Sequence, residues 1–510
     1  MVFSTGIGHS ISELQGGIPP PVVGGRFGGA GEPASFRQRS IVWRMAHGAW
    51  RSPGHSLLRL DCRDANGKAS IVATRIAYSE TVADARSPQG WRGILKWFSP
   101  SAGVAGSIPS LDGLRAMAVL MVMSFHAYHP DNSPMYMRTP FDIFRYGYTG
   151  VQLFFVLSGF LLFLPYARWL IGAQSHPSTR LFYERRILRV GPAYWVNIAI
   201  LLLTSKWSLR RFESGLAHAA FLHNVFFDPM ARLNGVLWTM AVEVQFYAVL
   251  PLLAWAMYWI ARMLYVMTHR VRFTFVAACF VVIAGCEALS VLCQWLIATK
   301  RWTSIPIVSR WPDALVNANS LPYWLGIFVF GMTCSLIYVS ITSARQRKST
   351  GSQEQRILAT IIGLLGVGLA FGLALAPLAG AHVMFLDSFF GLFFGLIVLG
   401  LLFGMKAFRW LFEFPALRFI GHISYSLYLW HLVVLMAIEP HLKAIHDPRQ
   451  HMLMGFLIDF GISIPVAYVS FLITERPFFS LRRRAREKPA VAGAPMASNQ
   501  QSALARQAIR

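Results

Sequence analysis

The sequence predicts an all-α, polytopic membrane protein: a helical bundle of about ten transmembrane helices with disordered N- and C-terminal tails. Of its 510 residues, 55% are hydrophobic and only 14% are charged, whereas soluble domains carry roughly 25% charged residues. Ten apolar stretches follow one another after about residue 107. A transmembrane helix needs about 20 largely apolar residues to cross a hydrocarbon core of about 30 Å.

Residues 1–106 differ from the rest of the chain. They are basic and rich in Gly, Pro and Ser, with helix-breaking runs such as GGIPPPVVGGRFGGAGEP, and they contain no stretch of spanning length. This composition is typical of disorder and predicts a cytoplasmic extension; an upstream translation artefact would explain it equally. Residues 107–480 form the predicted transmembrane domain, and residues 481–510 form a basic, disordered tail that begins near RRRAREK.

The ten predicted spans cover about 112–129, 148–171, 191–205, 235–261, 273–298, 320–341, 356–378, 383–404, 418–438 and 452–474. The third is short for a span. Basic residues gather in both tails and in the even-numbered loops, which places both termini in the cytoplasm by the positive-inside rule. Lys206, Arg210, Arg211, Lys300 and Arg301 weaken the asymmetry. Small residues at four-residue spacing, Gly368/Gly372 and Gly391/Gly395, predict close helix packing.

The net charge of +24 and the five cysteines exclude some functions. The basic residues lie mostly in tails and loops, as topology signals and contacts with anionic lipids do, and no nucleic-acid motif accompanies them. Cys279, Cys286 and Cys293 recur every seven residues among apolar neighbours without a CxxC. This pattern favours a packed, reduced stripe over a metal site or a disulfide framework.

Arg115 and His126 lie inside the first apolar stretch, LDGLRAMAVLMVMSFHAYH. Eleven helical steps advance about 16 Å and turn about 1100°, so both side chains point from one face, three turns apart. At least one ionisable group therefore lies at membrane depth, which indicates function; a surface amphipathic helix is the alternative. A guanidinium near the cytoplasmic end suits phosphate, and an imidazole can take a hydroxyl proton. Asp112 would cap the helix or orient Arg115.

Two further segments lie near the second span. Ser158 in FFVLSGFLL favours packing or an intrahelical hydrogen bond, and no G-x-S-x-G pattern surrounds it. Arg185, Arg186 and Arg189 in YERRILRVGPAYW form a dense cationic cluster. It is either a topology anchor or a binding site for phosphates.

The fourth and ninth spans carry more polar side chains. Glu243 and Tyr247 share a face of LWTMAVEVQFYAVLP. A carboxylate there must be paired or protonated, with Arg115 or His126 as its partner. Trp238 and Thr239 precede it by one turn and could line the same pocket, whereas Tyr425, Tyr428 and His431 of SYSLYLWH form an interfacial belt or line a polar cavity.

Taken together, these segments resemble the acyltransferase-3 family of bacterial integral-membrane O-acyltransferases. The matching pieces are LDGLRAMAVLMVMSFH, FFVLSGFLL, RRILRVGPAYW, LWTMAVEVQFYAVLP, SYSLYLWH and TERPF, in the family's order. The resemblance implies ten transmembrane helices in the bacterial inner membrane. It also implies transfer of an acetyl or other short acyl group from acyl-CoA, a co-substrate rather than a bound cofactor, to a hydroxyl of an extracytoplasmic glycan or lipid-linked saccharide. Arg115 and His126 would be the core active-site pair.

The chemistry agrees with the residues, because acyl transfer needs a base for the acceptor hydroxyl and a cationic site for the donor phosphates. We expect His126 to be the base or a transient acyl carrier, and Glu243 and Tyr247 to orient or polarise the reactants. Arg115 and the arginines of RRILR would hold the donor. The alternatives are a transporter or flippase of a glycan or small anionic substrate, and a non-catalytic membrane scaffold. The identities of the acyl group and of the acceptor, and the oligomeric state, stay open at this point.

Overall fold

The computed structural model describes residues 57–63, 69–75, 108–128, 140–204, 208–225, 233–269, 271–299, 317–347, 352–375 and 386–478. The chain divides into two units, residues 1–89 and 90–510. The first unit contains an antiparallel hairpin of β1 (Leu57–Arg63) and β2 (Ala69–Arg75), which the sequence analysis did not predict. The predicted disorder of the remaining N-terminal extension and of the tail after residue 478 lies outside the described residues.

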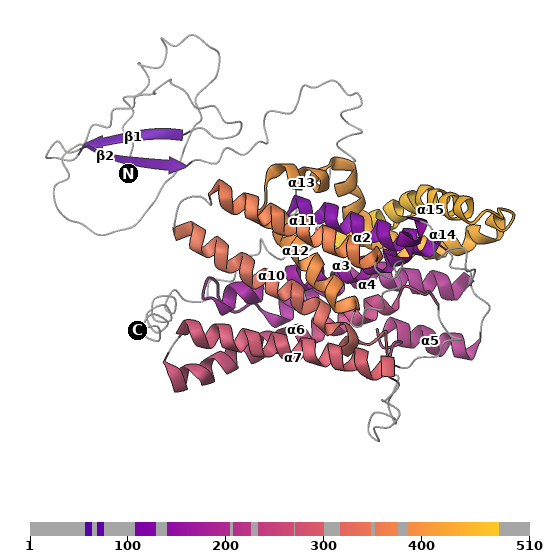
Figure 1. Ribbon diagram of the computed structural model, residues 1–510, viewed down its shortest axis with the longest axis horizontal. Helices are drawn as coiled ribbons and strands as arrows, with labels where there is room; N and C mark the ends of the chain where they lie inside the picture. Colours follow the sequence, from indigo (N-terminus) through magenta and orange to yellow (C-terminus); the bar gives the residue numbers. More distant parts are fainter. Residues whose placement is uncertain are drawn as a thin grey trace, which may run out of the picture. The chain divides into compact units, whose positions relative to one another are not determined.

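In its described part, the second unit is entirely helical, and its long helices run roughly alongside one another (Figure 1). Its elements are α2 (Pro109–Ala127), the 3₁₀ helix η2 (Pro140–Tyr148), α3 (Thr149–Leu170), α4 (Thr179–Thr204), α5 (Leu209–Ala219), α6 (Trp238–Thr268), α7 (Val271–Thr299), α10 (Leu321–Arg347), α11 (Gln353–Leu375), α12 (Leu386–Phe403), α13 (Lys406–Glu413), α14 (Pro415–Leu442), α15 (Pro448–Ser470) and the π-helical turn η6 (Phe471–Glu475).

The predicted membrane bundle is confirmed. Each of the ten predicted spans coincides with a long helix, and α4 extends the short third span towards its N-terminal side. Nine helical segments in the described part of the chain are long and apolar enough to cross a membrane. The first predicted span, α2, is not among the nine, in keeping with its Asp112, Arg115 and His126, yet most of its apolar residues are buried.

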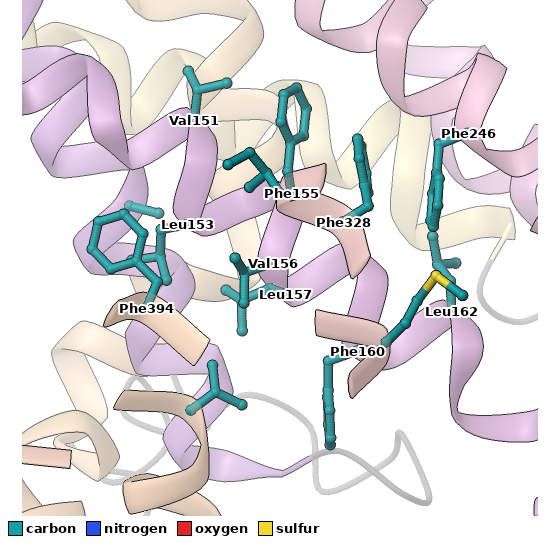
Figure 2. Packing of buried hydrophobic residues seen from close by; sticks show 14 of the residues in the cluster. Val151, Leu153, Phe155, Val156, Leu157, Phe160, Leu162, Phe246, Phe328 and Phe394 are labelled. Carbon is teal, nitrogen blue, oxygen red and sulfur yellow. The ribbon is translucent and has the colours of Figure 1, made fainter. Parts of the chain in front are cut away.

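The centre of the bundle is the contact between α3 and α10, the most extensive between any two helices. Gly159 of α3 faces the backbone of Phe328, and Gly331 of α10 faces the backbone of Val156, so the helices approach closely at two glycines. Around this contact, Phe328 stacks between Phe155 and Phe246, with ring centroids 4.6 and 4.0 Å apart (Figure 2). The close contact fixes the position of α3 relative to α10, and α3 carries Ser158.

A second close contact positions α2. Gly113 of α2 faces the backbone of Phe412 in α13, and Gly421 of α14 faces the backbone of Asp112. A side chain at either glycine would collide with main-chain atoms that cannot rotate away. As a result, α14 packs along α2 and faces the helix that carries Arg115 and His126.

The predictions about small residues are only partly confirmed. Gly391 and Gly395 do pack on α10, but nothing lies within 4 Å of the positions that a Cβ would occupy at Gly368 and Gly372, so that prediction is wrong. The contact of α11 with α12 uses other glycines of the same helices: Gly363, Gly366 and Gly400. The packing of the cysteine stripe is confirmed: Cys279, Cys286 and Cys293 are buried.

Candidate active site

A pocket lined by both polar and apolar side chains lies between α2, α3, α6 and α14. Its volume is about 450 Å³, including open solvent at its mouth. Six of the predicted site residues line it: Arg115, Ser158, Thr239, Glu243, Tyr425 and Tyr428. The rest of the lining consists of Val151, Phe154, Phe155, Met240 and Ser424. Four helices that are far apart in sequence thus bring polar side chains to one cavity, which is typical of a ligand site inside a helical bundle.

One end of the pocket holds an ionic network. The Ser158 hydroxyl donates a hydrogen bond of 2.7 Å to Oε1 of Glu243, and the Glu243 carboxylate interacts electrostatically with Arg115. Of the two partners considered for Glu243, the structure therefore gives Arg115 rather than His126. Ser158 does not make the predicted intrahelical hydrogen bond but joins α3 to α6, because its hydroxyl faces the pocket.

The arginines of α4 lie behind this end of the pocket. Arg186 interacts electrostatically with Glu243 and Tyr247, and its guanidinium lies 5.7 Å from the ring centroid of Phe182. Arg189 interacts with Arg115, and Arg185 interacts with Arg186. Two of the three predicted cations are therefore close to the pocket, although none of the three lines it.

Glu475 is a component that the sequence analysis did not assign to the site. Its side chain is 2% exposed, it accepts a hydrogen bond of 2.6 Å from the Ser426 hydroxyl, and it interacts electrostatically with Arg189 and Arg115. It ends η6, a π-helical turn of the kind that often marks functional sites. The sequence signal that could have identified Glu475 as a site residue was a carboxylate at membrane depth in TERPF, close to the helix-stopping Pro477.

A pair of histidines, His126 and His431, lies beyond Tyr428 and does not line the pocket. Nε2 of His431 lies 3.2 Å from Nδ1 of His126, and the ring centroids are 5.1 Å apart. Tyr428 connects the pair to the pocket, because its ring lies 5.7 Å from that of His431 and its hydroxyl accepts a hydrogen bond of 2.9 Å from Thr239. Tyr425 instead donates to the carbonyl of Val190 at 2.7 Å, joining α14 to α4.

Like the two histidines and the arginines of α4, three more predicted residues do not line the pocket. Tyr247 is buried one turn from Glu243 and interacts with it. Trp238 packs edge-on against Phe155, with centroids 6.5 Å apart. Asp112 does not cap α2, because the helix begins at Pro109 after Ile108 and shows no side-chain cap. The predicted capping role is therefore wrong, and the Asp112 carboxylate interacts with Arg115 instead.

The remaining acids at membrane depth are away from the pocket wall. Asp387 accepts hydrogen bonds from Tyr323 at 2.7 Å and from Gln152 at 2.5 Å, and Asp459 accepts one from Ser463 at 2.7 Å. Within the described ranges, no group of three or more His, Cys, Asp or Glu is close enough to hold a metal ion.

Comparison with known proteins gives a family match. The model of the acyltransferase-3 family, described as an acyltransferase domain, matches residues 108–475, which include every predicted site residue. The chain is 24% identical over 393 residues to the peptidoglycan O-acetyltransferase OatA of Listeria monocytogenes, covering 72% of this chain and 55% of that protein.

Two more relatives extend the comparison. The putative peptidoglycan O-acetyltransferase YrhL of Bacillus subtilis is 24% identical over 408 residues, covering 72% of this chain and 54% of that protein. Nodulation protein 10 of Rhizobium leguminosarum is 30% identical over 172 residues, or 29% of this chain and 45% of that protein. The chain thus spans about half the length of the curated relatives it matches. No solved structure matches.

Proposed function

The chain belongs to the acyltransferase-3 family, and from this premise we propose that it moves an acetyl or other short acyl group from acyl-CoA to a hydroxyl of a cell-surface glycan or lipid-linked saccharide. One observation carries the proposal: a pocket lined by Arg115 and Glu243 lies beside a buried network of arginines and carboxylates, and a histidine pair lies beyond its wall residue Tyr428. Acyl transfer needs these two components, a binding site for an anionic donor and a base for the acceptor.

The charges of the network favour an anionic ligand. The electrostatic network comprises four arginines, Arg115, Arg185, Arg186 and Arg189, and the three carboxylates of Asp112, Glu243 and Glu475, so cations exceed anions by one among these seven groups. In a medium of low dielectric constant such an excess attracts an anion strongly, and guanidinium groups match phosphate oxygens in geometry. The distribution of basic loops puts this end of α2 near the cytoplasm, where acyl-CoA is available.

The reaction follows from the other end. The acceptor hydroxyl gives its proton to Nε2 of His126 while its oxygen attacks the thioester carbonyl. The C–S bond then breaks, and the thiolate of coenzyme A takes the proton from the imidazolium. Negative charge develops on the carbonyl oxygen during the attack, and a hydrogen-bond donor directed at it lowers the barrier. The Tyr428 hydroxyl, on the pocket wall near the histidine pair, is the candidate donor; it would turn to the carbonyl oxygen of the thioester from the carbonyl oxygen of Val236, to which it donates at 3.3 Å.

The acceptor class rests on the relatives. Two of them carry peptidoglycan O-acetyltransferase in their names, and both match this chain over 72% of its length. We therefore infer a glycan hydroxyl as the acceptor here. The bacterial inner membrane, with both termini in the cytoplasm, is the proposed location, since it places the donor end of the pocket towards the cytoplasm and the acceptor end towards the outside.

Replacing His126 with alanine tests the proposal. Cells that express the wild-type protein or His126→Ala are compared for ester-linked acyl groups on surface glycans by mass spectrometry. We expect the variant to reach the membrane in normal amounts but to lose acylation. His446→Ala, at an exposed histidine far along the chain, is the matched control. Undiminished acylation by His126→Ala would contradict the proposal, and transport of an unmodified glycan by the wild type would favour a flippase.

A further inference from the structure

We propose that His431 is a positioning residue, which holds His126 in the tautomer that leaves Nε2 free to accept a proton. The inference rests on the proposed function for its chemical purpose, but the hydrogen bonds that carry it do not depend on any substrate. It goes beyond that function because it gives the base a specific neutral partner, in the place where a carboxylate orients histidine in other acyl-transfer sites.

The tautomer of His431 follows from its backbone neighbours. Nδ1 lies 2.9 Å from the carbonyl oxygen of Tyr428 and 3.2 Å from that of Leu427. Carbonyl oxygens only accept hydrogen bonds, so Nδ1 carries the hydrogen. A neutral imidazole has a single N–H, and its Nε2 is then an acceptor. The ring is fully buried, which favours the neutral form.

The tautomer of His126 follows in the same way. Its Nδ1 lies 3.0 Å from the carbonyl oxygen of Val122 and 3.2 Å from Nε2 of His431. Both neighbours are acceptors, so Nδ1 of His126 carries the hydrogen and shares it between them. The opposite tautomer would set the lone pair of Nδ1 against two further lone pairs. Nε2 of His126 is therefore the basic nitrogen.

The arrangement also distributes the charge of the reaction. When Nε2 of His126 takes the acceptor proton, the ring becomes an imidazolium, and its Nδ1–H bond to His431 becomes charge-assisted. The hydrogen can then move to Nε2 of His431, so one positive charge is shared by two rings. No described carboxylate forms a hydrogen bond with either ring. The pair is thus neutral before the reaction and returns to neutrality when the proton passes to the leaving thiolate.

Two substitutions separate positioning from packing. His431→Leu removes the acceptor, whereas His431→Gln keeps an acceptor oxygen at a similar reach. We expect kcat to fall by about 10- to 100-fold in His431→Leu, as for other residues that orient a functional histidine. The KM for acyl-CoA should stay unchanged, and His431→Gln should recover most of the loss. Equal kcat values for the wild type and His431→Leu, or equal losses in both variants, would overturn the inference.

A spectroscopic measurement removes the dependence on activity. In protein labelled with ¹⁵N-histidine and reconstituted in nanodiscs, the His126 signals are identified by their absence in His126→Ala. We expect Nδ1 to carry the hydrogen in the wild type and the share of the Nε2–H tautomer to rise in His431→Leu, where the carbonyl oxygen of Val122 holds that hydrogen without His431. An Nε2–H tautomer in the wild type would refute the inference. If the wild type transfers no acyl group, the proposed function fails, while the tautomer result still decides the role of His431.

Discussion

Substituting Gly159 with alanine tests whether the closest helix contact sets the geometry of the pocket. A Cβ at this position would lie 3.0 Å from the carbonyl carbon of Phe328 and closer still to its oxygen, whereas non-bonded carbon atoms prefer about 3.5–4.0 Å. Because the obstacle is backbone, α3 and α10 must move apart by roughly 1 Å. Overpacking of this kind costs about 1–3 kcal/mol.

The same displacement reaches the site through the neighbouring residue. Ser158 holds Glu243 by a hydrogen bond of 2.7 Å, and a shift of about 1 Å would lengthen this bond beyond a useful range. A misplacement of that size can reduce turnover by about 100-fold. We therefore expect Gly159→Ala to lower both the thermal stability of the purified protein and its acyl-transfer rate, each measured in the same detergent.

Gly368→Ala is the matched control for this experiment. Gly368 is also a glycine within an apolar helix, but nothing lies within 4 Å of the position of its added Cβ. Alanine favours helix by about 1 kcal/mol over glycine, so the control should be neutral or slightly more stable. If Gly159→Ala matched the control in both stability and rate, the close contact would not govern the pocket.

Two further predictions concern charge. Glu475→Gln keeps an acceptor for Ser426 but removes a buried negative charge that interacts with Arg189 and Arg115. We expect this variant to lose about 3 kcal/mol of unfolding free energy and to have lower activity. A change in unfolding free energy of less than about 1 kcal/mol, measured by calorimetry, would contradict this prediction. His218 and His223 lie outside the candidate spans and stack, with their ring centroids 3.9 Å apart. Burial lowers the pKa of both side chains. The pKa of His223 falls to about 3, because burial and, to a smaller extent, the charge of His218 both lower it. Between about pH 3 and pH 6.5 the unfolded chain therefore binds more protons than the folded protein, so the contribution of the pair to stability is complete above about pH 6.5 and is lost as the pH falls towards 3. In His223→Phe the melting temperature should fall less steeply over this pH range. An unchanged pH dependence of the melting temperature would exclude the pair as its cause.

The site was predictable where a polar residue stands alone in an apolar helix. Arg115, Ser158 and Glu243 are conspicuous in this way, and all three line one pocket. Their partners were not predictable, because a one-dimensional pattern does not say which helices become neighbours. Glu475 shows the limit most clearly, since its approach to Ser426 depends on a π-helical turn that no local signal in TERPF specifies.

The fold was predictable to a similar depth. Apolar length alone identified the helices, because a bilayer-spanning segment has few alternatives. The spacing of small residues along the sequence did not show which side of a helix packs against its neighbours. Gly366 packs against α12 while Gly368, two residues later and about 200° around the helix, faces open space. The capping role of Asp112 failed for a related reason: Pro109 begins the helix four residues earlier than an aspartate cap would allow.

The unbroken course of α2 has a consequence for donor choice. Arg115 and His126 belong to one continuous helix, and a helix of fixed rise keeps them about 16 Å apart. On the proposed function, a donor reacts only if its arm is long enough to carry the acyl carbon across this interval while its anionic group stays at Arg115. Selection would then act on the length of the donor's arm, and a shortened thioester could occupy the pocket yet remain unreacted.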